Sequence, residues 1–82
     1  MQRGTRSRPG ALTRSLAAVL SNAFDDAYIT QEHLANIIGT SDSTVSRILR
    51  GEVVLDAERL DLICMALGVP LADVVTAADQ NR

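Results

Sequence analysis

Apolar residues recur at helical spacing in five separate segments of the chain. The first segment starts near Leu12, and its apolar stripe is Leu16, Val19, Leu20 and Phe24. Residues 24–28, FDDAY, interrupt this spacing, so we expect the first helix to end there. The second segment is QEHLANII, residues 31–38, and its inward face is Leu34, Ala35 and Ile38.

Three further segments repeat the helical spacing. Residues 42–50 place Val45, Ile48 and Leu49 within about 100° of one another on a helical wheel. The stripe of residues 57–67 is Leu60, Ile63, Cys64 and Leu67, and residues 70–78 are expected to turn Leu71, Val74 and Val75 inward. No segment convincingly predicts a strand, so the fold class is all-α, a compact bundle of five helices.

Residues that typically begin and end helices flank these segments. Side chains that favour the N-cap position precede three of them: Thr30, Ser41 and Asp56. Glycine, which favours the position just after a helix, follows the same three: Gly39, Gly51 and Gly68. Pro70 suits the start of the last helix. Residues 52–56, EVVLD, are therefore a connector between the third and fourth helices.

The two ends of the chain are polar. Residues 1–10, MQRGTRSRPG, hold two glycines, a proline and almost no apolar side chain, which predicts a flexible basic arm. Residues 79–82, DQNR, form a polar tail. Between them, residues 11–78 are expected to form one small domain, and 2% aromatic residues make its core aliphatic.

The composition excludes several classes of function. One cysteine and one histidine, Cys64 and His33, allow neither an internal disulfide nor a structural zinc site, so we expect no metal. The chain lacks a G-x-S-x-G nucleophile motif and a phosphate-binding glycine loop, so we expect no enzyme, no cofactor and no small-molecule ligand. It also lacks an apolar run of about 18 residues and a leader sequence, which predicts a soluble cytoplasmic protein that does not enter the membrane.

Charge is unevenly distributed along the chain. The formal net charge is −2, yet residues 1–14 carry four arginines and no acid. The rest of the chain carries the other four arginines and all ten acidic residues. A basic arm on an acidic body is a layout that suits a polyanionic partner, although the net charge alone argues weakly against one.

The polar face of residues 42–50 points to the same kind of partner. Ser43, Arg47 and Arg50 cluster within about 60° opposite the apolar stripe. Such a helix is ~13 Å long, which matches the ~12 Å width of the DNA major groove. An arginine can donate two hydrogen bonds to guanine O6 and N7, and serine hydroxyls reach bases or phosphates. A merely solvated helix surface carries the same residue types, so the face alone leaves both interpretations open.

Two longer stretches favour the DNA-binding interpretation through a resemblance. ITQEHLANIIGTSDSTVSRILRG, followed by LDAERLDLICMALGVPLADVV, resembles the Cro/C1-type helix-turn-helix domain of phage repressors and bacterial regulators. The resemblance covers about residues 12–77, with the helix-turn-helix itself at about residues 30–50. It implies that the helix at residues 42–50 enters the major groove of double-stranded DNA.

The resemblance also implies roles for individual residues. The positions that usually touch bases are Asp42, Ser43 and Arg47. The positions that touch phosphate or support a base contact are Gln31, Ser41, Thr44, Ser46 and Arg50. Asp42 departs from the family pattern, because this position often carries glutamine or arginine. Its carboxylate either accepts a hydrogen bond from cytosine N4 or only stabilises the start of the helix.

The connector at residues 51–56 departs from the family pattern too, because it lacks the basic residues that often contact the DNA backbone there. The arm can supply these contacts through Arg3, Arg6 and Arg8, on phosphates or in the minor groove. The alternative is that the arm only aids solubility or remains from cloning.

Four apolar residues stand where related domains tend to carry polar ones: Ile37, Leu49, Val53 and Val54. They either pack against their neighbours or form a patch for a partner or a second subunit. Because few cations face the DNA, we expect a homodimer on a palindromic site, as is common in the family.

These observations predict a sequence-specific transcriptional regulator, a repressor of the phage or bacterial type that occupies an operator. The alternative function is an antitoxin, or another protein-interaction module on the same fold. A third alternative makes the chain the DNA-binding part of a longer repressor.

Overall fold

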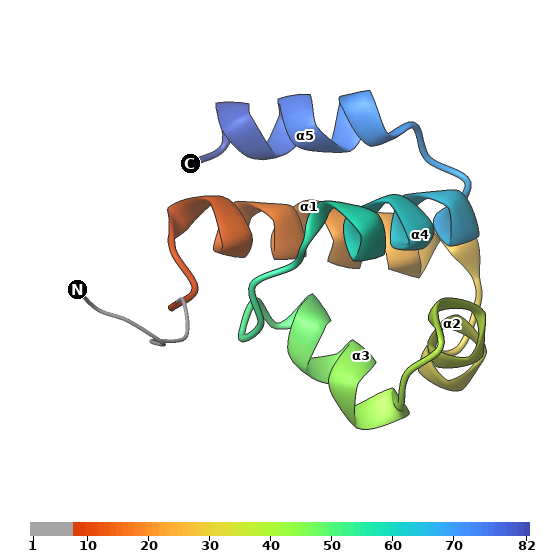
Figure 1. The fold of residues 1–82 in the computed structure, drawn as a ribbon. Coiled ribbons are helices and arrows are strands. Elements are labelled where there is room, and N and C mark those ends of the chain that lie inside the picture. The colour runs from red at the N-terminus through yellow and green to blue at the C-terminus, as the bar shows by residue number, and fades with distance from the viewer. Residues whose placement is uncertain (1–7) are drawn as a thin grey trace.

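The computed structural model describes residues 8–82, and these residues form five helices joined by short connections (Figure 1). The helices are α1 (Ala11–Ala27), α2 (Gln31–Ile38), α3 (Asp42–Leu49), α4 (Ala57–Leu67) and α5 (Leu71–Gln80). The described part of the chain contains no strand. The predicted all-α bundle of five helices is confirmed.

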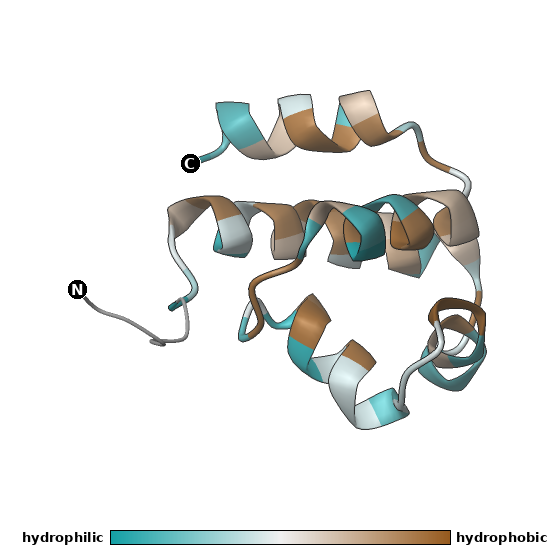
Figure 2. Ribbon diagram, viewed as in Figure 1, coloured by the Kyte–Doolittle hydropathy of each residue, from teal (hydrophilic) through white to brown (hydrophobic). Residues whose placement is uncertain are grey.

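Helix α1 is the centre of the packing. It contacts α3, α4 and α5, and α5 runs back along it in the opposite direction (Figure 1). Helix α2 packs between α3 and α4. The apolar faces turn toward this shared interior (Figure 2), and its largest fully buried side chains are Leu20, Leu34, Val45, Ile48, Ile63 and Cys64. The core is aliphatic, as the composition predicted.

All three predicted N-caps are confirmed by their hydrogen bonds. Thr30 Oγ1 accepts from the His33 amide at 3.0 Å, and Ser41 Oγ accepts from the Thr44 amide at 3.2 Å. Asp56 Oδ1 accepts from the Arg59 amide at 2.8 Å. Each bond satisfies an amide in the first turn that has no partner within its own helix.

The first helix ends within residues 24–28, as expected, but only at the last of them. Helix α1 continues through residues 24–27 and ends at Tyr28, whose φ of 56° is left-handed. The reason lies in the helical period: Asp25 and Asp26 are exposed, whereas Phe24 and Ala27 are partly buried against the core. Two consecutive acids on the outer face therefore do not interrupt the helix.

The predicted inward face of the last helix was partly wrong. Leu71 and Val75 are 38% and 42% exposed, whereas Val74 and Ala78 are buried. Helix α5 packs through this i, i+4 pair, and it extends through Gln80 into the predicted polar tail. The small side chain of Ala78, which is fully buried, permits close approach of neighbouring residues.

Two further observations concern the arm and membranes. Arg3 and Arg6 lie outside the described residues, and Arg8 is exposed just before α1. Within residues 8–82, no single helix is long and apolar enough to cross a membrane. Helices α4 and α5 meet that criterion only as a pair, which is bent by 109°.

Candidate nucleic-acid interface

Helices α2 and α3 are joined by a tight turn that begins at Gly39. The φ of Gly39 is +75°, a left-handed conformation that glycine adopts without a steric penalty. The Thr40 amide donates to the Ala35 carbonyl at 2.9 Å, which ends α2, and Ser41 then caps α3. Val45 and Ile48 are buried on the inner face of α3, so the opposite face of this helix points away from the domain.

That outward face collects most of the predicted contact residues. Asp42, Ser43 and Arg47 are exposed, and Ser46 is half-buried beside them. An open surface hollow of about 420 Å³ is lined by Gln31, Asp42, Ser43, Ser46, Arg47 and Arg50. The structure therefore brings together all three predicted base-contact residues and three of the five predicted supporting residues.

The other two predicted supporting residues, Ser41 and Thr44, are engaged with each other. Ser41 Oγ donates to Thr44 Oγ1 at 3.1 Å and accepts from the Thr44 amide. Neither residue lines the hollow. Their contacts hold the first turn of α3, which fixes the position of the residues that do face outward.

Arg50 at the end of α3 is held by an acid that sequence reasoning missed. Its Nε donates to Glu52 Oε2 at 2.9 Å and its Nη2 to Oε1 at 3.5 Å, while Nη1 donates to Ser46 Oγ at 2.8 Å. The hydrogen bond from Arg50 lowers the pKa of the Glu52 carboxyl, and the same bond raises the pKa of Arg50. By contrast, Arg47 forms no ion pair with any residue in the described range 8–82.

The C-terminal end of α3 is anchored to α1. Ser21 Oγ donates to the Leu49 carbonyl at 2.8 Å, which satisfies one of the carbonyls left open at the helix end. Gly51 is buried against α1, where an added Cβ would lie 3.3 Å from Ala17 Cβ. Nothing in the sequence marks Ser21, a polar residue in the middle of a helix, for this role.

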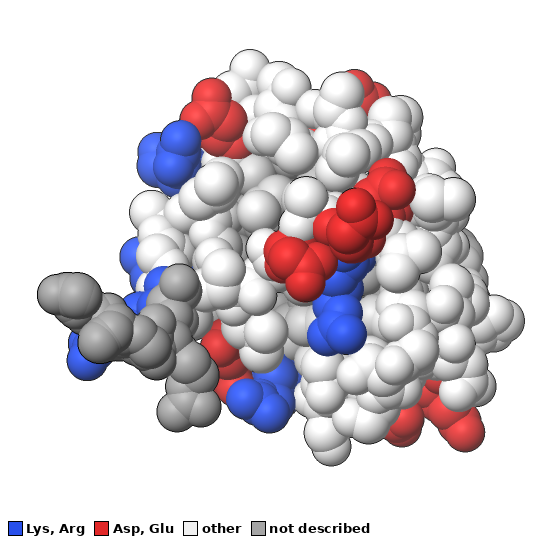
Figure 3. All heavy atoms as spheres, viewed as in Figure 1, with Lys and Arg blue, Asp and Glu red and all other residues white. Residues whose placement is uncertain are grey.

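Charges are mixed over the visible surface rather than gathered by sign. Figure 3 shows a row of acidic side chains across α4, with basic side chains scattered beside and below it. The cations available to an anionic partner on α3 are Arg47 and Arg50. Electrostatic attraction by the folded domain alone is therefore modest.

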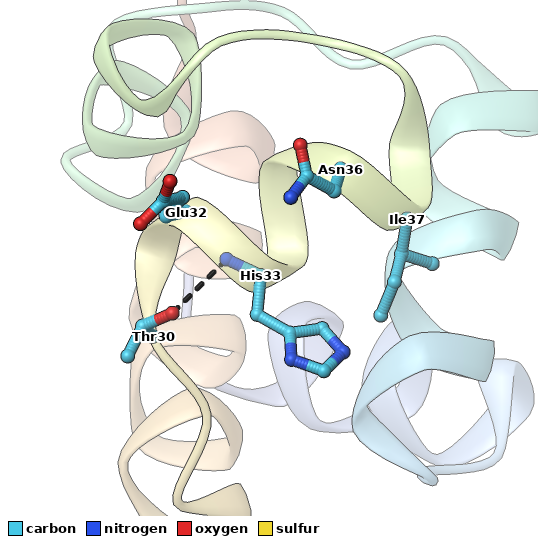
Figure 4. A pocket seen from close by; sticks show the side chains of 5 residues that line it. All are labelled: Thr30, Glu32, His33, Asn36 and Ile37. Carbon is cyan, nitrogen blue, oxygen red and sulfur yellow. Dashed lines mark hydrogen bonds between the residues drawn. The ribbon is translucent and has the colours of Figure 1, made fainter.

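The structure divides the four residues predicted as a partner patch. Ile37 and Val54 are 47% and 43% exposed, whereas Leu49 and Val53 are partly buried against the core. Ile37 also borders an open hollow of about 450 Å³ on α2, and the other lining residues are Thr30, Glu32, His33 and Asn36 (Figure 4).

A capped pair of helices with a tight turn, an anchored second helix and a polar outward face define a helix-turn-helix domain. The family model described as "Helix-turn-helix" matches residues 20–74, and the chain belongs to this family, of the Cro/C1 type. The family consists of DNA-binding regulators and is not enzymatic, which confirms both the predicted resemblance and the predicted lack of enzyme activity.

Two solved structures, both of the clp gene regulator ClgR from Corynebacterium glutamicum, resemble this one along most of its length. The first is 30% identical with a TM-score of 0.81, and the match covers 88% of this chain and 77% of that chain. The second is 30% identical with a TM-score of 0.78, and the match covers 93% of this chain and 96% of that one. No curated protein sequence matches the chain.

Proposed function

We propose that this protein is a sequence-specific transcriptional regulator that inserts α3 into the major groove of its operator. The observation that carries the proposal is the outward face of α3. Arg47, which forms no ion pair within residues 8–82, lines a hollow there together with Asp42, Ser43 and Gln31. Its guanidinium can donate to guanine O6 and N7, which discriminates between bases by about 1–3 kcal/mol.

The neighbouring residues take complementary roles. Ser43 contacts a base edge, and Asp42 either accepts from cytosine N4 or stabilises the N-terminus of α3. Gln31 and Ser46 line the same hollow and brace the phosphates or the base contacts. Ser41 and Thr44 support the helix start through their mutual hydrogen bond.

The regulator acts as a repressor of the phage or bacterial type, in the cytoplasm, by occupying an operator and excluding polymerase. The similarity to ClgR supports a role in gene regulation.

The protein binds a palindromic operator as a homodimer. The domain presents few cations, so one subunit alone would hold DNA weakly, and two subunits on half-sites about 34 Å apart would add their contacts. Leu71 and Val75 leave an apolar strip exposed on α5 that a second subunit can cover. Sedimentation equilibrium with and without DNA tests this, and a monomer on a single half-site would contradict it.

The proposal is tested by selecting duplexes from a random pool and measuring their binding by fluorescence anisotropy. We expect the selected duplex to bind at least ~10³-fold more tightly than random duplex at the same salt concentration. Equal binding of the two, or no binding of either, would overturn the proposal.

One observation favours a second candidate, an antitoxin or other protein-interaction module. Ile37 is half-exposed at the edge of the hollow on α2, and Val54 is similarly exposed in the connector. In such a module these residues, rather than the face of α3, contact the partner. Arg47→Ala would then leave partner binding intact, whereas Ile37→Asp would abolish it.

A further inference from the structure

The Schellman turn at the end of α3 places an acidic side chain beside the DNA-facing arginines. The Gly51 amide donates to the Ile48 carbonyl at 3.0 Å, and the Glu52 amide donates to the Arg47 carbonyl at 3.0 Å. Gly51 has a φ of +76° and is buried against α1. The turn is therefore held both by its own hydrogen bonds and by packing against α1. The chain therefore turns back on α3 and brings Glu52 to Arg50.

The resulting contacts engage two of the predicted DNA-contacting side chains at once. Arg50 uses Nε and Nη2 on the Glu52 carboxylate and Nη1 on Ser46 Oγ. A phosphate oxygen that approached Arg50 would have to replace that carboxylate, since both are anionic acceptors for the same donors. The carboxylate also stands near the negative end of the α3 dipole, where an acid is unfavourable unless a cation compensates it.

We infer that Glu52 is an internal competitor for the DNA backbone, which withholds Arg50 from phosphate and thereby suppresses non-specific binding. The inference rests on the proposed DNA-binding function and deepens it, because it names the residue that limits the electrostatic part of the affinity. Non-specific affinity comes almost wholly from phosphate contacts, whereas specific affinity adds the base contacts of Arg47. A residue that neutralises one phosphate-binding arginine therefore lowers the phosphate part of the affinity, on which binding to random duplex depends almost wholly.

The alternative is that the Arg50–Glu52 pair only stabilises the end of the helix. Both side chains are more than half exposed, at 57% and 51% of their surface, and such pairs contribute little to folding. The two explanations differ in what neutralising Glu52 does to DNA binding, and they differ most clearly when Arg50 is also removed.

The experiment compares Glu52→Gln with the wild-type protein on a random-sequence duplex of about 30 base pairs, long enough for two half-sites. We expect affinity to rise about two- to fivefold, the range that an exposed ion pair spans. The slope of log K against log salt concentration should steepen by up to about 0.9, one additional phosphate contact. Glu58→Gln is the matched control, since it removes the same charge from exposed Glu58 on α4.

A double variant decides whether Glu52 acts through Arg50. In the Arg50→Gln background, Glu52→Gln should leave both affinity and salt slope unchanged. The inference is overturned if the gain persists in that background, if Glu58→Gln gives the same gain, or if Glu52→Gln gives none. If the wild type binds random duplex measurably and only the Glu52 effect is absent, the proposed function survives. If no variant binds any duplex, both fail.

Discussion

Arg47 and Arg50 stand about one turn apart on α3 in different electrostatic settings. Arg47 has no ion-pair partner within residues 8–82, whereas Arg50 is held by Glu52 and Ser46. A base or phosphate that binds Arg47 displaces no ion-pair partner within residues 8–82, but one that binds Arg50 must displace a carboxylate. Both arginines are exposed, yet we expect them to contribute unequally to binding.

This contrast predicts unequal effects of removing the two arginines. Arg47→Ala should weaken binding to the selected duplex about 5- to 150-fold, because it removes contacts worth about 1–3 kcal/mol. Arg50→Ala should weaken binding to this duplex by less than about fivefold. In the wild type a phosphate contact of Arg50 only replaces its ion pair with Glu52, so little affinity is lost with the side chain. Anisotropy titrations measure both, with Arg82→Ala at the far end of the chain as the control. A larger loss at Arg50 than at Arg47 would contradict this ranking.

Cys64 gives a prediction at the same scale that concerns the core rather than DNA. Its side chain is 1% exposed, and burial, together with the negative charge of Asp61, raises the pKa of the thiol. At pH 8 the folded protein therefore holds less thiolate than an unfolded chain, and a disulfide reagent should react much more slowly before denaturation than after it.

The raised pKa also sets the direction of a pH effect on stability. The unfolded chain releases the Cys64 proton first, so the contribution of this group to stability is complete below the unfolded thiol pKa of about 8.5 and falls above it. Urea unfolding at pH 7 and pH 9.5 should show this decline in the wild type and a smaller one in Cys64→Ala. An equal decline in both would show that Cys64 is not its source.

At the scale of the helix, the anchoring of α3 on α1 depends on the absence of a side chain at Gly51. Gly39 and Gly51 share the left-handed conformation, with φ of +75° and +76°. A Cβ on Gly39 would meet nothing within 4 Å, whereas one on Gly51 would approach Ala17 Cβ at 3.3 Å and Arg14 Cα at 3.4 Å. The two glycines form a matched pair that separates conformational strain from steric crowding.

We expect Gly39→Ala to lower the free energy of unfolding by about 1–2 kcal/mol, the penalty of the left-handed conformation. Gly51→Ala should lower the free energy of unfolding by about 1–3 kcal/mol more than Gly39→Ala does, because the added methyl group crowds α1. Urea titrations followed by circular dichroism measure both values. Equal losses at the two positions would mean that α3 can shift away from α1 without penalty.

The helices and their caps were predictable from sequence because both depend on local patterns. Spacing marked the buried faces of α2, α3 and α4, and Thr30, Ser41 and Asp56 marked three helix starts. The continuation of α1 through residues 24–27 and the inward face of α5 were not predictable from apolar residues alone. Acids can continue a helix on its outer face, and a small alanine can be among the most deeply buried residues of the core.

The candidate site was predictable in part for the same reason. The outward face of α3 followed from the wheel and the resemblance, so Asp42, Ser43 and Arg47 were identified together. Glu52 and Ser21 were missed, because each acts through a contact that a wheel for α3 does not include. The one signal for Glu52 was Gly51, since a glycine after a helix predicts a turn that brings the next residue back to it.

At the scale of the whole molecule, the folded domain and the arm carry opposite charge. Residues 1–10 hold three arginines and no acid, and we propose that Arg3, Arg6 and Arg8 contact phosphates or the minor groove. Replacing all three with glutamine should reduce the salt slope of DNA binding by up to about 0.9 per arginine. Anisotropy at several salt concentrations measures the slope, and an unchanged slope would show that the arm does not touch DNA.

The central claim is that α3 reads bases through Arg47, and a parallel selection tests it most directly. Wild-type protein and Arg47→Ala are each used to enrich duplexes from the same random pool, and the enriched sequences are compared base by base. We predict that the wild type selects a palindromic motif with a guanine in each half-site, and that the variant loses this preference while retaining the rest. The same motif from both proteins, or no motif from the wild type, would contradict the account.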